Sequence, residues 1–84
     1  MKSYNEALEI YRKLAQSNPQ TYLPYVAVTL INLSIFYQEG QPDKNVSVKY
    51  AAEALRIVIP LLEQIPATQR YAQTARQILQ NLGV

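Results

Sequence analysis

The longest nearly apolar run in this chain is VAVTLINLSIFY, residues 26–37, which only Thr29, Asn32 and Ser34 interrupt. These twelve residues are too few to cross a hydrocarbon core of about 30 Å, so the run predicts a buried helix and no membrane span. A helix that is apolar around most of its circumference must be covered by neighbours on most sides. We therefore expect a central helix, from about residue 21 to 38, packed among others.

Three further helical segments are expected, at about residues 3–17, 45–64 and 67–82. In each of them apolar residues recur at the i, i+3, i+4 and i+7 spacing of an α-helix, and no segment keeps the period of a strand. A chain of 84 residues is also too short for a second core. The sequence thus predicts one all-α domain, residues 1–84, in which four helices form two stacked antiparallel pairs.

Capping residues and prolines mark the expected ends of the helices. Ser3 and Glu6 match a capping box at the first start, and Asn18-Pro19 ends that helix because the residue before proline leaves the α region. Gly40 is expected to end the second helix. The loop 41–45 follows.

Beyond that loop, Asn45 or Ser47 is expected to cap the third helix. Pro60 falls on its solvent side, so we expect a bend there and an end near Pro66.

Composition excludes most catalytic and metal chemistry. The chain has no cysteine and no histidine, which removes thiolate and imidazole ligands and the usual nucleophile–base pairs. Its acidic residues offer no paired carboxylates: Glu6 is taken by capping, and Glu53 lies at ion-pair spacing between Lys49 and Arg56. We expect no enzyme activity, no cofactor and no metal site. The lack of cysteine fits a cytoplasmic location.

Charge also limits the nucleic-acid alternative, a helical regulator with a mildly basic surface. The formal net charge is +2, and phosphate binding requires clustered basic residues. The eight basic residues are instead scattered along the chain, in or beside three of the four expected helices: Lys2, Arg12, Lys13, Lys44, Lys49, Arg56, Arg70 and Arg76. Nucleic acid is therefore the second hypothesis, behind a protein partner.

The first and third expected helices repeat each other at an offset of 47 residues. The matching pairs are Glu6/Glu53, Ala7/Ala54, Leu8/Leu55, Ile10/Ile57, Leu14/Leu61, Pro19/Pro66 and Thr21/Thr68. A helical repeat too small to bury its own apolar face must stack on a neighbour, as in an α-solenoid.

These residues resemble the tetratricopeptide repeat family, in the longer form found in kinesin light chains and many bacterial scaffolds. The resemblance rests on the second-helix pattern, Ala7, Tyr11, Leu14 and Pro19, then Ala54, Val58, Leu61 and Pro66, and on the first-helix residues Leu30, Leu33, Ser34 and Tyr37. The chain departs from the pattern in its 47-residue spacing, in the leucines at 14 and 61, and in Val58 where an aromatic is usual.

The resemblance implies a non-catalytic scaffold whose groove holds a peptide or helix of a partner protein. The residues expected to line that groove are Tyr25, Thr29, Asn32 and Phe36. In this family an asparagine often stands at the place of Asn32, where its amide can pair with a peptide backbone.

The resemblance also implies that the first helix lacks a preceding neighbour. Its apolar surface is then expected to be exposed, and large exposed patches usually mark interfaces. We expect self-association there, as a possible homodimer, through Tyr4, Leu8 and Tyr11. The last helix has a polar outer face and resembles a terminal cap.

Overall fold

A computed structural model describes residues 3–40 and 43–83. It contains four α-helices, α1 (Tyr4–Ser17), α2 (Pro19–Ile35), α3 (Lys44–Val58) and α4 (Thr68–Asn81). A short π-helix, η1 (Phe36–Gly40), continues α2, and a 3₁₀ turn, η2 (Ile59–Leu61), follows α3. The described residues contain no strand, which confirms the all-α prediction.

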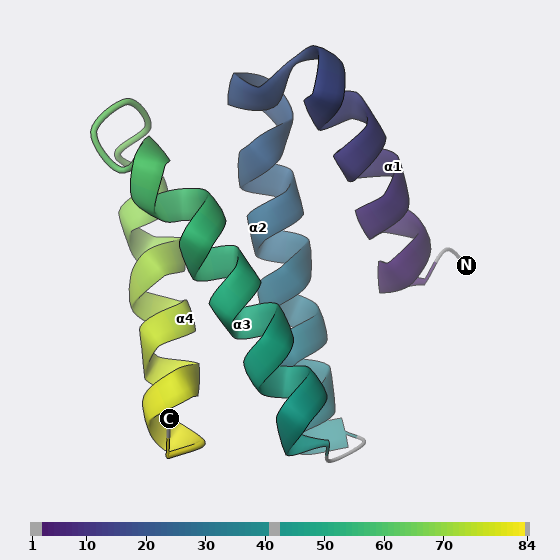
Figure 1. Cartoon of the computed structure of the whole chain (residues 1–84), viewed down its shortest axis with the longest axis vertical. Coiled ribbons are helices and arrows are strands. Elements are labelled where there is room, and N and C mark those ends of the chain that lie inside the picture. The colour runs from purple at the N-terminus through teal and green to yellow at the C-terminus, as the bar shows by residue number, and fades with distance from the viewer. Residues whose placement is uncertain (1–2, 41–42, 84) are drawn as a thin grey trace.

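Successive helices run in opposite directions, and α3 crosses α2 (Figure 1). The helix α2 packs against α1, α3 and α4, so the most apolar segment of the chain is the centre of the fold. The Cα atoms extend 33 × 31 × 16 Å, a layer about two helices deep. In such a layer α1 and α4 each keep one side that no other helix covers.

The main core lies between α2 and its neighbours, and small residues bring α2 and α3 close together. Val26 and Leu30 are almost fully buried on α2 and meet Ala51 and Ala54 of α3, which are completely buried. A second cluster joins α3 to α4 and the middle of α2. Its buried members are Ala27, Val58 and Ala72.

The turn between α1 and α2 is shorter than expected. Asn18 serves both helices, since its backbone N–H donates to the carbonyl of Leu14 and its side chain accepts from the N–H of Thr21. Pro19 occupies the first turn of α2, where its missing N–H costs no helical hydrogen bond. The helix α2 therefore begins two residues earlier than the expected Thr21.

Two expected features of α3 are wrong. Asp43 caps the helix by accepting from the N–H of Val46, whereas Asn45 lies inside the first turn and Ser47 is buried. The expected loop 41–45 is thus partly helical, and residues 41–42 lie outside the described residues. The α-helix also ends at Val58, because Pro60 has no N–H to donate and the chain tightens into η2.

None of the helices in the described ranges combines the length and the hydrophobicity required to traverse a lipid bilayer.

Candidate functional site

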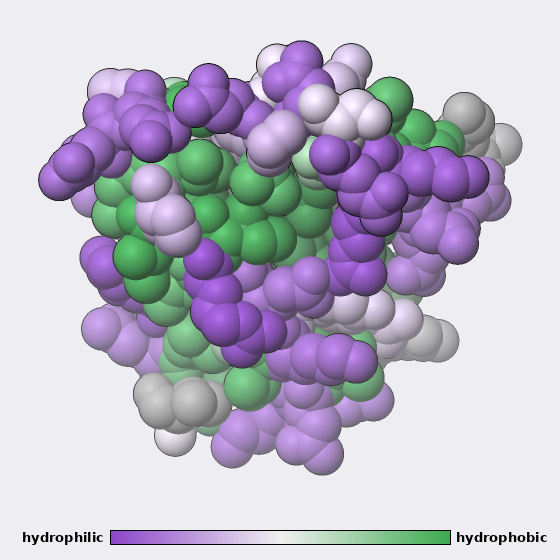
Figure 2. Space-filling model, turned by 45° about the horizontal axis from the view of Figure 1, so that its top comes forward, coloured by the Kyte–Doolittle hydropathy of each residue, from purple (hydrophilic) through white to green (hydrophobic). Residues whose placement is uncertain are grey.

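Large exposed apolar side chains are concentrated on the first helical hairpin. Of the six among the described residues, five belong to α1, α2 or η1 and only Ile59 lies beyond α3. The five are Tyr4, Ile10, Leu14, Tyr25 and Phe36. Figure 2 shows that, on the face it presents, hydrophobic residues form a broad area bordered by hydrophilic ones.

Three tyrosines join α1 to α2 at the edge of this hairpin. The rings of Tyr11 and Tyr25 are stacked, with centroids 5.3 Å apart and planes 20° from parallel. Tyr22 lies beside them, 6.1 Å from the Tyr25 ring centroid. We call Tyr11, Tyr22 and Tyr25 the tyrosine cluster. It fixes the position of Tyr25, whose side chain remains half exposed at 49%.

The residues expected to line a groove on α2 do not all reach the surface. Tyr25, Asn32 and Phe36 are exposed and follow one another along the helix. Thr29 is buried, and its hydroxyl donates to the carbonyl of Tyr25 at 2.8 Å. At 5% exposure Thr29 presents almost no surface to a ligand, and its hydroxyl proton is already donated within the helix.

The expected self-association surface on α1 also needs correction. Tyr4 is exposed and Tyr11 is half-buried in the tyrosine cluster, but Leu8 is buried in the main core. The exposed apolar residues on α1 include Ile10 and Leu14, which were not among the residues expected at a surface. Their i, i+4 spacing was the available signal, since such a pair lies on one side of a helix.

The internal repeat shows that this side of α1 carries a packing surface. Leu14 is 39% exposed, whereas its repeat equivalent Leu61 is 7% exposed. Ala7 is half-buried, whereas its equivalent Ala54 is fully buried against α2. The repeat residues Ala54 on α3 and Leu61 on η2 are thus buried inside the fold. Their equivalents on α1 remain partly exposed to solvent.

A shallow recess separates α1 from α3. Its larger part, about 460 Å³, is lined by both helices and includes Leu8, Lys49 and Tyr50. Its smaller part, about 230 Å³, is mainly apolar and includes Val26 and Ile57. Arg12 and Glu53 border both parts.

Arg12 and Glu53 form an ion pair across this recess, with 2.5 Å between the guanidinium Nη2 and the carboxylate Oε2. Glu53 lies at ion-pair spacing from Lys49 and Arg56 on its own helix, but its partner in the structure is Arg12 on α1. Both side chains keep contact with solvent, 48% for Arg12 and 25% for Glu53, so the pair contributes little stability. It links α1 directly to α3.

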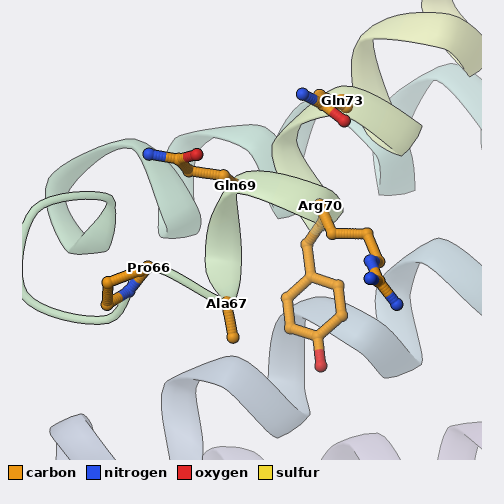
Figure 3. A pocket seen from close by; sticks show the side chains of 6 residues that line it. Pro66, Ala67, Gln69, Arg70 and Gln73 are labelled. Carbon is orange, nitrogen blue, oxygen red and sulfur yellow. The ribbon is translucent and has the colours of Figure 1, made fainter.

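A second recess, about 470 Å³, lies at the start of α4. Its lining includes Pro66, Gln69, Arg70 and Gln73, and the side chains of Gln69 and Arg70 point to different sides of the helix (Figure 3). The polar groups of Gln69 and Arg70 therefore do not converge on one point.

The described residues also contain no group of three or more acidic, histidine or cysteine side chains that could hold a metal ion. All buried polar side-chain atoms among them have a hydrogen-bond partner, so none is left free to bind a ligand inside the fold. The features that remain are surfaces rather than a cavity with convergent polar groups.

Comparison with protein-family models, with curated proteins and with solved structures found no match to this chain.

Proposed function

We propose that this chain is a non-catalytic protein-interaction module of tetratricopeptide type, which binds a peptide or helix of a partner protein and also self-associates. The observation that carries the proposal is the concentration of exposed large apolar residues on α1, α2 and η1. Exposed apolar groups gathered on one part of a small protein are typical of interaction surfaces. A cytoplasmic location remains the expectation from the cysteine-free composition.

The partner surface that we propose consists of Tyr25, Asn32 and Phe36. Tyr25 and Phe36 are eleven residues apart along one continuous helix, about 16 Å at 1.5 Å per residue, which matches roughly three turns of a partner helix. Tyrosine supplies a large contact area at low entropic cost, and its packing against Tyr11 holds Tyr25 in place before binding. Asn32 adds an amide that can donate and accept hydrogen bonds.

The nucleic-acid alternative has less support. Arg12 is already paired with Glu53, and the other basic residues within the described ranges belong to three different helices. Phosphate-driven binding would appear as an affinity that falls steeply with salt, whereas an apolar protein interface changes little.

A phage-displayed peptide library panned against the immobilised chain at about 0.15 M salt tests the proposal. We expect binders with apolar residues at helical i, i+4 and i+7 spacing. Tyr25→Ala and Phe36→Ala should each weaken their binding at least about tenfold, because central aromatic residues dominate interface energies. Ile59→Ala is the matched control, since Ile59 is equally exposed but lies away from this surface.

If the selected peptides bind all three variants equally, the α2 surface is not the peptide-binding site. A library that yields no binder, together with salt-sensitive binding of DNA or RNA, would favour the nucleic-acid alternative.

A further inference from the structure

The outward side of α1 is the strongest unexplained surface of the molecule. Ile10 and Leu14 are exposed at its centre, beside the half-buried Ala7. At about 100° per residue, Glu6 and Lys13 flank these residues on one side of the helix, and Tyr4 and Tyr11 flank them on the other. Glu6 and Lys13 are both exposed, and neither has an ion-pair partner among the described residues.

We infer that this side of α1 docks onto the same side of α1 from a second copy of the chain, with the two helices antiparallel. This inference rests on the proposed function, of which it specifies the self-association. A twofold interface requires a patch that complements itself when it is reversed. The residues of α1 meet this requirement in size, in charge and in aromatic character.

When the second α1 is placed antiparallel to the first, with the twofold axis at the middle of the helix between Ile10 and Tyr11, the residues that face each other are determined. Ile10 of each copy meets its counterpart at the centre. The small Ala7 of one copy lies opposite the large Leu14 of the other, so a leucine enters the space that an alanine leaves.

The same reversal brings equal flanks together. Glu6 of one copy falls within one helical turn of Lys13 of the other, twice in each dimer, which gives two ion pairs. On the opposite flank the tyrosines of the two copies face each other. A parallel arrangement would instead place the charged flank against the tyrosines and leave both charges without partners.

The outer side of α4 argues against head-to-tail stacking of copies. A stack would cover α1 with the exposed side of α4, but the residues there are polar and exposed: Gln69, Gln73, Arg76 and Gln80. That side supplies no apolar surface for Ile10 and Leu14. The second copy of α1 does.

One helix face is smaller than a standard interface of about 800 Å² per partner, so the dimer should dissociate on dilution. Sedimentation equilibrium between about 10 µM and about 1 mM covers the dissociation constants that small interfaces give. Leu14→Glu should raise the dissociation constant at least about tenfold, since it places a charge at the centre of the patch twice per dimer. Ile59→Glu, the matched exposed isoleucine, should leave it unchanged.

Charge exchange tests the direction of pairing. Glu6→Lys alone should weaken the dimer about three- to tenfold, and so should Lys13→Glu alone, because each replaces two attractions by two repulsions. The double variant Glu6→Lys/Lys13→Glu should restore the original dissociation constant. Failure of the double variant to recover affinity, while it remains as helical as the original by circular dichroism, would overturn the antiparallel pairing.

The absence of native cysteine allows a direct test of the register. With diamide as oxidant, Ala7→Cys and Leu14→Cys should form a disulfide-linked dimer when the two variants are mixed, and much less when either is alone. In the inferred dimer positions 7 and 14 of different copies are opposed, whereas identical positions are about 10 Å apart along the axis, beyond disulfide reach. Ile59→Cys should not cross-link above background.

Cross-linking of either variant alone as efficiently as the mixture would overturn the register, and a chain that stays monomeric at about 1 mM would overturn the dimer itself. Either result leaves the peptide-binding test on Tyr25 and Phe36 unaffected. The two proposals can therefore fail separately.

Discussion

Ser34 of α2 and Ser47 of α3 donate their hydroxyl groups to each other's backbone carbonyl, both at 2.8 Å. The two hydroxyl oxygens lie 3.0 Å apart, and both side chains are completely buried. Each hydroxyl thus donates its hydrogen bond to the neighbouring helix rather than to its own helix. This pair of small polar residues holds α2 and α3 together at the point where α2 gives way to η1.

Removal of one of these hydroxyls should cost a measurable but moderate amount of stability. We expect Ser34→Ala to lower the free energy of unfolding by about 1 kcal/mol, the net value of a typical buried hydrogen bond. Ser34→Val should cost about 1–3 kcal/mol, because added methyl groups push two closely packed helices apart. Urea denaturation measures both, with exposed Ser17→Ala as the control. Equal stability of Ser34→Ala and Ser17→Ala would contradict this role.

The close approach of α3 to α2 also depends on Ala54. Its side chain is completely buried, and because protein interiors are close-packed a larger side chain would have to displace its neighbours. We expect Ala54→Leu to lower the free energy of unfolding by about 1–3 kcal/mol through overpacking. Gln73→Leu, on the exposed side of α4, should change it by less than about 0.5 kcal/mol. A thermal unfolding series that ranks the two variants in the opposite order would show that this contact is loosely packed.

Asp43 is expected to set the start of α3. Its carboxylate accepts a hydrogen bond from the N–H of Val46, so Asp43→Ala should destabilise the chain by about 0.5–2 kcal/mol. Asn45→Ala is the natural comparison, because Asn45 is exposed inside the first turn and makes no capping bond in the structure. We expect it to be close to neutral in chemical denaturation. A larger loss of stability for Asn45→Ala than for Asp43→Ala would indicate that Asn45, and not Asp43, caps α3.

The ion pair between Arg12 and Glu53 should be a minor contributor. Because both side chains contact solvent, Glu53→Gln should cost less than about 1 kcal/mol at low salt. The difference should shrink further at about 1 M salt, where the screening length is about 3 Å. Glu63→Gln, at an exposed position outside the recess, provides the control for loss of one charge. A larger effect that persists at high salt would indicate that the pair also orders α1 against α3.

Local sequence signals predicted the number and type of the helices well. Ser3 accepts from the N–H of Glu6 at the start of α1, which is one half of the expected capping box; the described residues show no return bond to the Glu6 carboxylate. Asn18 and Pro19 separate α1 from α2, and the polar residues assigned to the outer side of α4 are exposed. These features depend on contacts within one or two turns of the chain, so the neighbouring residues are sufficient to specify them.

The errors concern residues whose environment is supplied by a distant helix. Thr29 and Ser47 are polar and were assigned to surfaces or caps, but packing buries both. Their burial is tolerated because each hydroxyl has an acceptor, on its own helix for Thr29 and on α2 for Ser47. Leu8 was expected at an interface and instead fills the core. Periodicity gives the side of a helix on which a residue lies, but not which helix covers that side.

The amino-acid order alone determined that this chain forms four antiparallel helices around one very apolar segment, because helix formation and termination follow from local spacing, caps and prolines. The tertiary arrangement decided the rest: that Leu61 is covered while its repeat equivalent Leu14 is not, and that Tyr25 is held by Tyr11. Exposure is a property of the space between helices, and that space exists only after the helices have packed.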